Sequence, residues 1–155
     1  MSDIEKRLEE LNIKLSQGTS PVANYVSMQR AGDMLYFSGA GPFVEGKAVY
    51  KGRLGENLTI DEGYEASKIA AINLLSVLKR EIGDLDKVDQ IVKVLGFVSS
   101  TNDFYNQPAV INGASDLFVE VFGDKGRHAR CAVGTNVLPM GIPVEVEMII
   151  KLKSE

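Results

Sequence analysis

The chain has 155 residues, 45% of them hydrophobic, with one cysteine, one histidine and a formal net charge of -4. This length suits a single domain, residues 1–155, whose core needs no disulfide or metal, and one cysteine with one histidine excludes an intrachain disulfide and a Cys/His metal cage. The acidic net charge and the scattered basic residues disfavour a nucleic-acid partner. No apolar run approaches the roughly 18 residues of a membrane span, which disfavours a membrane partner. Together these features predict a cytoplasmic protein that binds a small molecule.

The N-terminal third is predicted to hold a short helix followed by short strands. Apolar residues at helical spacing predict an amphipathic helix near the N-terminus, and a polar loop follows it, so residues 1–20 form an extension ahead of the main fold. Alternating patterns and glycine turns predict a hairpin and a third short strand. In chain order these elements are a helix over residues 3–11 and strands over residues 25–30, 34–40 and 44–49.

Two longer helices and three strands are predicted in the rest of the chain. Thr59 and Glu62 have the spacing of a capping box at the start of the first helix, which ends before Gly83. Pro108 suits the first turn of the second helix, which ends at Gly123. The strands are expected over residues 90–100, 129–138 and 144–153. This order predicts an α+β fold with the two main helices packed on one face of a mixed β-sheet.

Arg130 is the residue that a half-buried strand does not explain. Alternation along the strand places it on the same face as Ala132 and Gly134, and places Cys131 on the other face. A guanidinium fixed beside such small side chains suits a planar carboxylate, which it binds through two parallel hydrogen bonds. An ion pair between Arg130 and one of the chain's own carboxylates explains the pattern equally well.

Glu145 and Glu147 share one face of the last predicted strand, opposite two valines and a methionine. A carboxylate near Arg130 would orient or deprotonate a water molecule. A strand with one solvated polar face gives the same pattern, and the pattern alone favours that interpretation.

Several segments along the chain form a recognisable set. Near the C-terminus they are HARCAV with Arg130, the Leu138-Pro139 turn and PVEVE with Glu145. Upstream they are Tyr25 in ANYV, Ser38 in LYFSGAGP, the long helix after Leu58, the strand ending in GFVSS, and Asn112. In this order the segments resemble the RidA/YjgF family, the reactive-intermediate deaminases also described as endoribonuclease L-PSP-like proteins. The resemblance covers nearly all of the chain beyond about residue 20, and the longer N-terminus is similar to the longer branch of the family.

The resemblance implies a chorismate-mutase-like fold, a homotrimer with a central barrel of sheets, and small-molecule pockets between subunits. It also implies a hydrolase that converts short-lived enamines and imines, such as 2-aminoacrylate, to 2-oxo acids and ammonia. By the same resemblance, Arg130 holds the substrate carboxylate, Glu145 positions the attacking water, and Tyr25, Ser38 and Asn112 line the pocket. An imine is already electrophilic, so no metal or organic cofactor is expected.

Two positions depart from the family's short form. Gly113 competes with Asn112 for the family's asparagine position, because the spacing to Arg130 differs by one residue. The family's usual cysteine position holds Ala132 here, which leaves the substrate range open. Two other functions also stay open: a non-catalytic protein that binds a carboxylate metabolite or a regulatory partner, and a ribonuclease, which the acidic charge disfavours.

Overall fold

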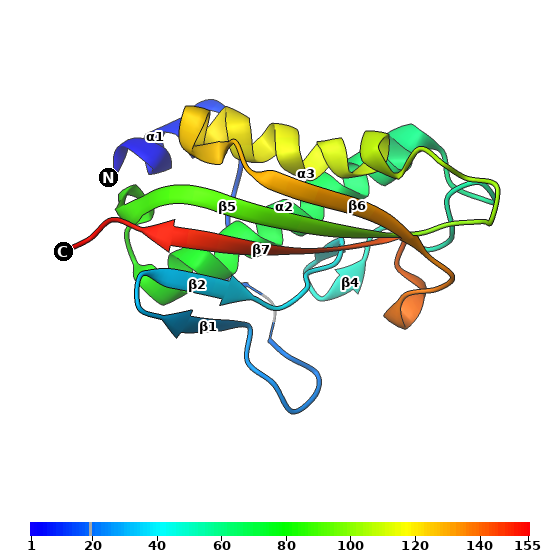
Figure 1. Ribbon diagram of the computed structural model, residues 1–155, viewed down its shortest axis with the longest axis horizontal. Coiled ribbons are helices and arrows are strands. Elements are labelled where there is room, and N and C mark those ends of the chain that lie inside the picture. Colours follow the sequence, from blue (N-terminus) through cyan, green and yellow to red (C-terminus); the bar gives the residue numbers. More distant parts are fainter. Residues whose placement is uncertain (19) are drawn as a thin grey trace.

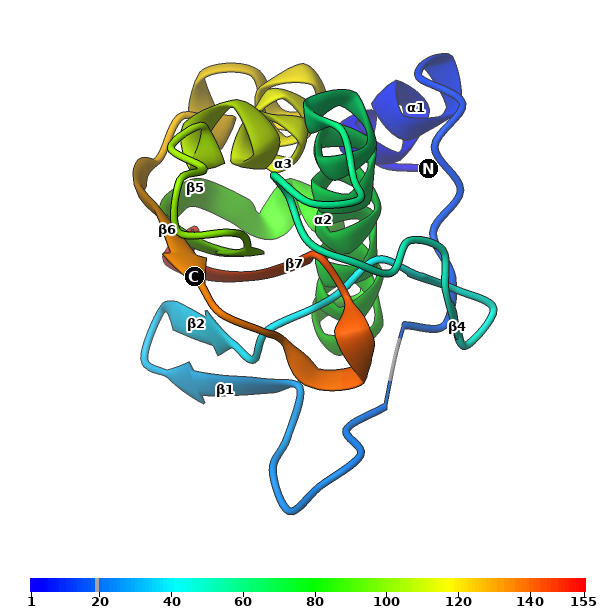
Figure 2. The same cartoon turned by 90° about the vertical axis from the view of Figure 1, so that its right-hand side faces the viewer.

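A mixed five-stranded sheet carries two long helices on one face (Figures 1 and 2) in the computed structural model, which describes residues 1–18 and 20–155. The predicted α+β arrangement is confirmed, while Thr19 of the predicted N-terminal loop lies outside the described residues. The helices are α1 (Asp3–Glu10), α2 (Ile60–Ile82) and α3 (Gln107–Phe122), with short 3-10 turns η1 (Leu85–Lys87), η2 (Gly123–Gly126) and η3 (Pro139–Gly141). The strands are β1 (Met28–Ala31), β2 (Met34–Phe37), β3 (Phe43–Val44), β4 (Lys47–Ala48), β5 (Val88–Ser99), β6 (Ala129–Thr135) and β7 (Val144–Leu152).

The ends of α2 are set by the residues that the sequence predicts. Thr59 Oγ1 accepts a hydrogen bond from the Glu62 amide at 3.2 Å, and the Glu62 carboxylate accepts one from the Thr59 amide at 3.1 Å. These reciprocal bonds satisfy amide groups that the first helical turn leaves unpaired. Gly83 ends the helix with φ 76°, a backbone conformation that a side chain disfavours.

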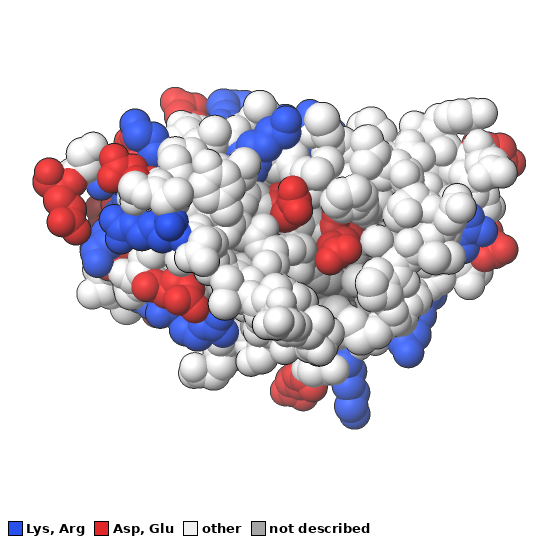
Figure 3. All heavy atoms as spheres, turned by 60° about the horizontal axis from the view of Figure 1, so that its bottom comes forward, with Lys and Arg blue, Asp and Glu red and all other residues white. Residues whose placement is uncertain are grey.

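The sheet has the strand order β1-β2-β7-β5-β6, in which β5 and β6 are parallel and the other neighbours are antiparallel. Along β7 alternate residues are fully or almost fully buried beneath the helices, whereas those between them are half-buried or exposed. The second set lies on the face that neither long helix covers, which we call the open face. Its surface is mostly uncharged, with a small acidic group near its middle (Figure 3).

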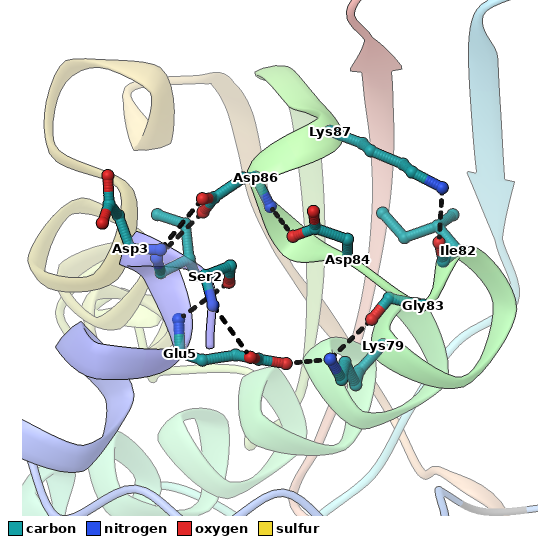
Figure 4. Close-up of polar contacts among 10 residues, drawn as sticks. Ser2, Asp3, Glu5, Lys79, Ile82, Gly83, Asp84, Asp86 and Lys87 are labelled. Atoms are coloured by element: carbon teal, nitrogen blue, oxygen red, sulfur yellow. Dashed lines mark hydrogen bonds and ion pairs between the residues drawn. The ribbon is translucent and has the colours of Figure 1, made fainter.

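The N-terminal helix α1 is anchored to the end of α2 and to η1 (Figure 4). The Asp86 carboxylate accepts hydrogen bonds from the Asp3 and Ile4 amides, both at 2.9 Å, and these bonds hold the Asp86 pKa below its usual value. Glu5 forms an ion pair with Lys79 of α2. Helix α1 of the N-terminal extension is therefore packed against the rest of the fold.

Several boundaries differ from the sequence prediction. The first strand begins at Met28 and not at residue 25, and the predicted third strand is the separate two-residue hairpin β3–β4. Strand β6 ends at Thr135, three residues early, because the Leu138-Pro139 segment leads into η3 instead of continuing the ladder. Within the described residues, we find no helix with the length and apolar character needed to cross a membrane.

Candidate functional site

Arg130 lies on β6, an edge strand, and its guanidinium reaches toward α3. Nη1 donates to Asn112 Oδ1 at 2.8 Å and to Ser115 Oγ at 3.1 Å, and Nη2 lies 3.4 Å from the Pro108 carbonyl oxygen. All three acceptors are neutral, and no carboxylate of residues 1–18 or 20–155 forms a salt bridge with this arginine. The interpretation of Arg130 as one half of an internal ion pair is therefore wrong, and its charge remains available to a ligand.

Close packing between α2 and α3 decides which residues of α3 meet Arg130. A Cβ on Gly113 would overlap the Tyr64 carbonyl, and Ser67 Oγ bonds both the Val110 carbonyl at 2.6 Å and the Ala114 amide at 3.1 Å. This contact faces α2. Asn112 and Ser115 flank it and lie three positions apart on the helix, so they share a different face, where both meet Arg130. Of the two candidates for the asparagine position, Asn112 contacts Arg130 and Gly113 serves helix packing.

Ser115 and His128 belong to this cluster, although the sequence pattern did not place either one beside Arg130. Ser115 Oγ lies 2.8 Å from His128 Nε2 and 3.1 Å from Arg130 Nη1. Burial, and secondarily the charge of Arg130, lowers the pKa of His128 below its ordinary value. A surface depression of about 250 Å³ opens over this cluster, lined by Ser115, Val119, Arg127, His128 and Arg130.

Glu145 lies on β7 and packs against the backbone that follows β2. A Cβ on Gly39 would overlap the Glu145 carboxylate, so the residue at this position must be glycine for the two to approach as they do. Partial burial raises the pKa of Glu145, and the neighbouring Glu147 charge adds to the effect. A carboxyl group with this shift can accept and hold a proton more readily than an exposed glutamate.

Tyr25 and Ser38 lie away from the Arg130 cluster, in the segments that precede β1 and follow β2. They line a small cavity of about 30 Å³ together with Gly39. Ser38 Oγ donates to the Val26 carbonyl at 2.6 Å, which ties the segment before β1 to the end of β2. Tyr25 is exposed on this segment. Gly39 lines this cavity and also lies against the Glu145 carboxylate, while two residues of α2 line the cavity as well.

Strand register places Arg130 and Glu145 on opposite faces of the sheet. Arg130 pairs with Val94, which is fully buried beneath the helices, whereas Glu145 pairs with Phe97, three residues further along the same strand. Paired residues share a face and successive residues alternate, so Arg130 faces the helices and Glu145 lies on the open face. One chain therefore does not bring its arginine and its water-positioning candidate together.

The same alternation along β6 places the two remaining sequence candidates, Cys131 and Ala132, on opposite sides of the strand. Cys131 is exposed on β6, on the opposite side of the strand from Arg130, and Ala132 is half-buried on the arginine's side. Within residues 1–18 and 20–155, no group of three His, Cys, Asp or Glu side chains could hold a metal ion.

Comparison with known proteins gives a consistent result over nearly the whole chain. The model of the YjgF/chorismate mutase-like family, described as candidate endoribonucleases, matches residues 5–152. Protein TCP17 of Trypanosoma cruzi is 41% identical over 97% of this chain and 95% of its own length. The crystal structure of Agrobacterium tumefaciens Atu1372, a protein of unknown function, is 39% identical, covers 97% of this chain and 92% of its own, and superposes with a TM-score of 0.91. A candidate endoribonuclease from Shewanella oneidensis is 32% identical over 97% of this chain and 100% of its own, with a TM-score of 0.94.

Proposed function

Because the chain belongs to the YjgF/chorismate mutase-like family, we propose that it hydrolyses enamines and imines of the 2-aminoacrylate type to 2-oxo acids and ammonia, without a cofactor. The observation that supports this most directly is the guanidinium of Arg130, which is held by three neutral acceptors. Its Nε and the outer edge of Nη2 remain free to donate two hydrogen bonds to a substrate carboxylate.

In the proposed reaction Arg130 binds the carboxylate and Glu145 positions water against the imine carbon. The water oxygen forms a bond to that carbon while one of its protons passes to the Glu145 carboxylate. The C=N electron pair moves to nitrogen, which takes up a proton from solvent. Glu145 then gives its proton to the carbinolamine nitrogen. The C–N bond breaks and ammonia leaves as the C=O bond forms and the hydroxyl proton passes to solvent. A raised Glu145 pKa suits both proton transfers.

The proposal requires two copies of the chain for each site. Arg130 with Asn112 forms one half-site on the helix face of β6, and Glu145 on the open face forms the core of the other, which Tyr25 and Ser38 approach through Gly39. We propose a homotrimer in which the edge strand of one copy meets the open face of the next, so that each interface joins one half-site of each kind.

Mixing inactive variants tests this directly. Arg130→Ala and Glu145→Gln should each lower kcat/KM for 2-iminopropionate by at least about 100-fold, since each removes charge-assisted contacts of about 1.5–3 kcal/mol apiece. When the two variants are unfolded and refolded together in equal amounts, about one-quarter of the interfaces combine an intact arginine with an intact glutamate. Recovery of about one-quarter of the wild-type rate supports the proposal. No recovery in a trimer shown to be mixed would contradict it.

A non-catalytic carboxylate-binding protein is the second candidate. It is favoured by the fact that the Arg130 half-site is complete within one chain whereas Glu145 is not near it. Calorimetric binding of 2-oxo acids, with no ammonia released from a panel of imines generated in situ, would identify this function. We do not propose ribonuclease activity, because a net charge of -4 opposes contact with a phosphate backbone.

A further inference from the structure

Ser115 and His128 form a hydrogen-bonded chain that ends at the guanidinium of Arg130. His128 Nδ1 lies 2.6 Å from the Gly126 carbonyl oxygen and Nε2 lies 2.8 Å from Ser115 Oγ. The imidazole also stands edge-on against Phe118, with ring centroids 5.9 Å apart at 88°. Three contacts on three sides fix the orientation of the ring.

The contacts determine where the protons lie. A carbonyl oxygen only accepts, so the Gly126 contact places a proton on His128 Nδ1. In the neutral ring Nε2 then has a lone pair, and the Ser115 hydroxyl donates its proton to it. The remaining lone pairs of Ser115 Oγ face Arg130 Nη1, which donates to them. The histidine therefore turns the serine hydroxyl into an acceptor for the arginine.

This arrangement occupies both hydrogens of Arg130 Nη1, one with Asn112 Oδ1 and the other with Ser115 Oγ. The plane of the guanidinium is thereby set before a ligand arrives. A donor fork that is already oriented loses less rotational freedom on binding a carboxylate than a mobile one.

We propose that His128, acting through Ser115, is a positioning residue for Arg130 and sets the affinity of the site for the substrate carboxylate. The inference rests on the proposed function for the identity of the ligand. Neither residue contacts the reacting atoms. Their effect is on ligand binding, so affinity tests it as well as turnover.

The test measures the dissociation constant of pyruvate by calorimetry, and kcat and KM for 2-iminopropionate. Ser115→Ala removes the acceptor, while His128→Asn keeps a donor for the Gly126 carbonyl but is too short to accept from Ser115. Each should weaken pyruvate binding and raise KM by about tenfold, which is the effect expected from losing one hydrogen bond to a charged group. The value of kcat should change by less than about twofold. His128→Gln places an acceptor near the former Nε2 position, so it should restore most of the lost affinity.

Tyr64→Phe is the matched control, because the Tyr64 hydroxyl also bonds α3, through Asp116 at 2.7 Å, without contacting Arg130. It should leave pyruvate affinity unchanged. Unchanged affinity in both Ser115→Ala and His128→Asn, with or without a loss of thermal stability, would overturn the positioning role. Pyruvate binding by a wild type that turns over no imine defeats the proposed deaminase but leaves this test intact, and a wild type that binds no 2-oxo acid overturns both.

Discussion

Replacing Asn112 with Asp tests whether the uncompensated charge of Arg130 is what binds the ligand. The substitution keeps the shape of the side chain and an oxygen 2.8 Å from Nη1, but it adds a negative charge that competes with the substrate carboxylate. Two unit charges about 4 Å apart interact by about 4 kcal/mol at an effective dielectric constant of 20, whereas exposed pairs contribute about 0.2–1 kcal/mol. Asn112 is exposed and Arg130 half-buried, so we expect about 1–2 kcal/mol.

That magnitude corresponds to a loss of about 5- to 30-fold in pyruvate affinity. Stability should not fall, because the new pair strengthens the contact between α3 and β6, and urea denaturation should give an unfolding free energy equal to or slightly above that of the wild type. Calorimetry at low and at moderate salt measures the affinity, and the difference from wild type should shrink as salt rises.

The matched control is Asn102→Asp, the same change at an exposed turn position that forms no hydrogen bond with Arg130. It should leave affinity within about twofold of wild type, because an exposed charge with no contact to Arg130 is weakened by solvent and salt. If Asn112→Asp bound pyruvate as tightly as the control, the free guanidinium would not be the ligand's anchor, and the proposed role of its charge would be wrong.

Three further changes follow from the same geometry. Gly39→Ala introduces a methyl group where the Glu145 carboxylate lies, so kcat should fall at least about tenfold while pyruvate affinity stays, as parallel kinetics and calorimetry would show. Burial, and then the charge of Glu147, raises the pKa of Glu145 in the folded chain above its ordinary value of 4.5, so ionising this group costs stability as pH rises above 4.5. Glu145→Gln should therefore resist urea better than wild type at pH 8, and lower stability would contradict this. Burial, and then the charge of Arg130, lowers the pKa of His128 in the folded chain below 6.5. The unfolded chain therefore takes up this proton at a higher pH, and stability should decline as pH falls below about 6.5. Denaturation curves over a pH series should show a shallower decline in His128→Asn than in wild type.

Local patterns in the sequence were enough to predict the types and order of the main elements, because helix and strand periodicities and end signals involve only neighbouring residues. Thr59 with Glu62, and Gly83, set the ends of α2 as predicted. Alternation along one strand also predicted that Cys131 and Arg130 lie on opposite sides of it, and the ladder of β6 confirms this. The family pattern named both Arg130 and Asn112 as site residues, and they form a hydrogen bond at 2.8 Å.

How separate elements face one another depends on tertiary packing, which local patterns do not record. Alternation gives each strand two faces but does not relate the faces of β6 to those of β7, and the register through β5 is what puts Arg130 and Glu145 on opposite sides. The choice between Asn112 and its neighbour Gly113 depended on close packing of α2 against α3. Ser115 and His128 lie 13 residues apart, on a helix and in a loop, and they meet only because the chain folds α3 beside β6.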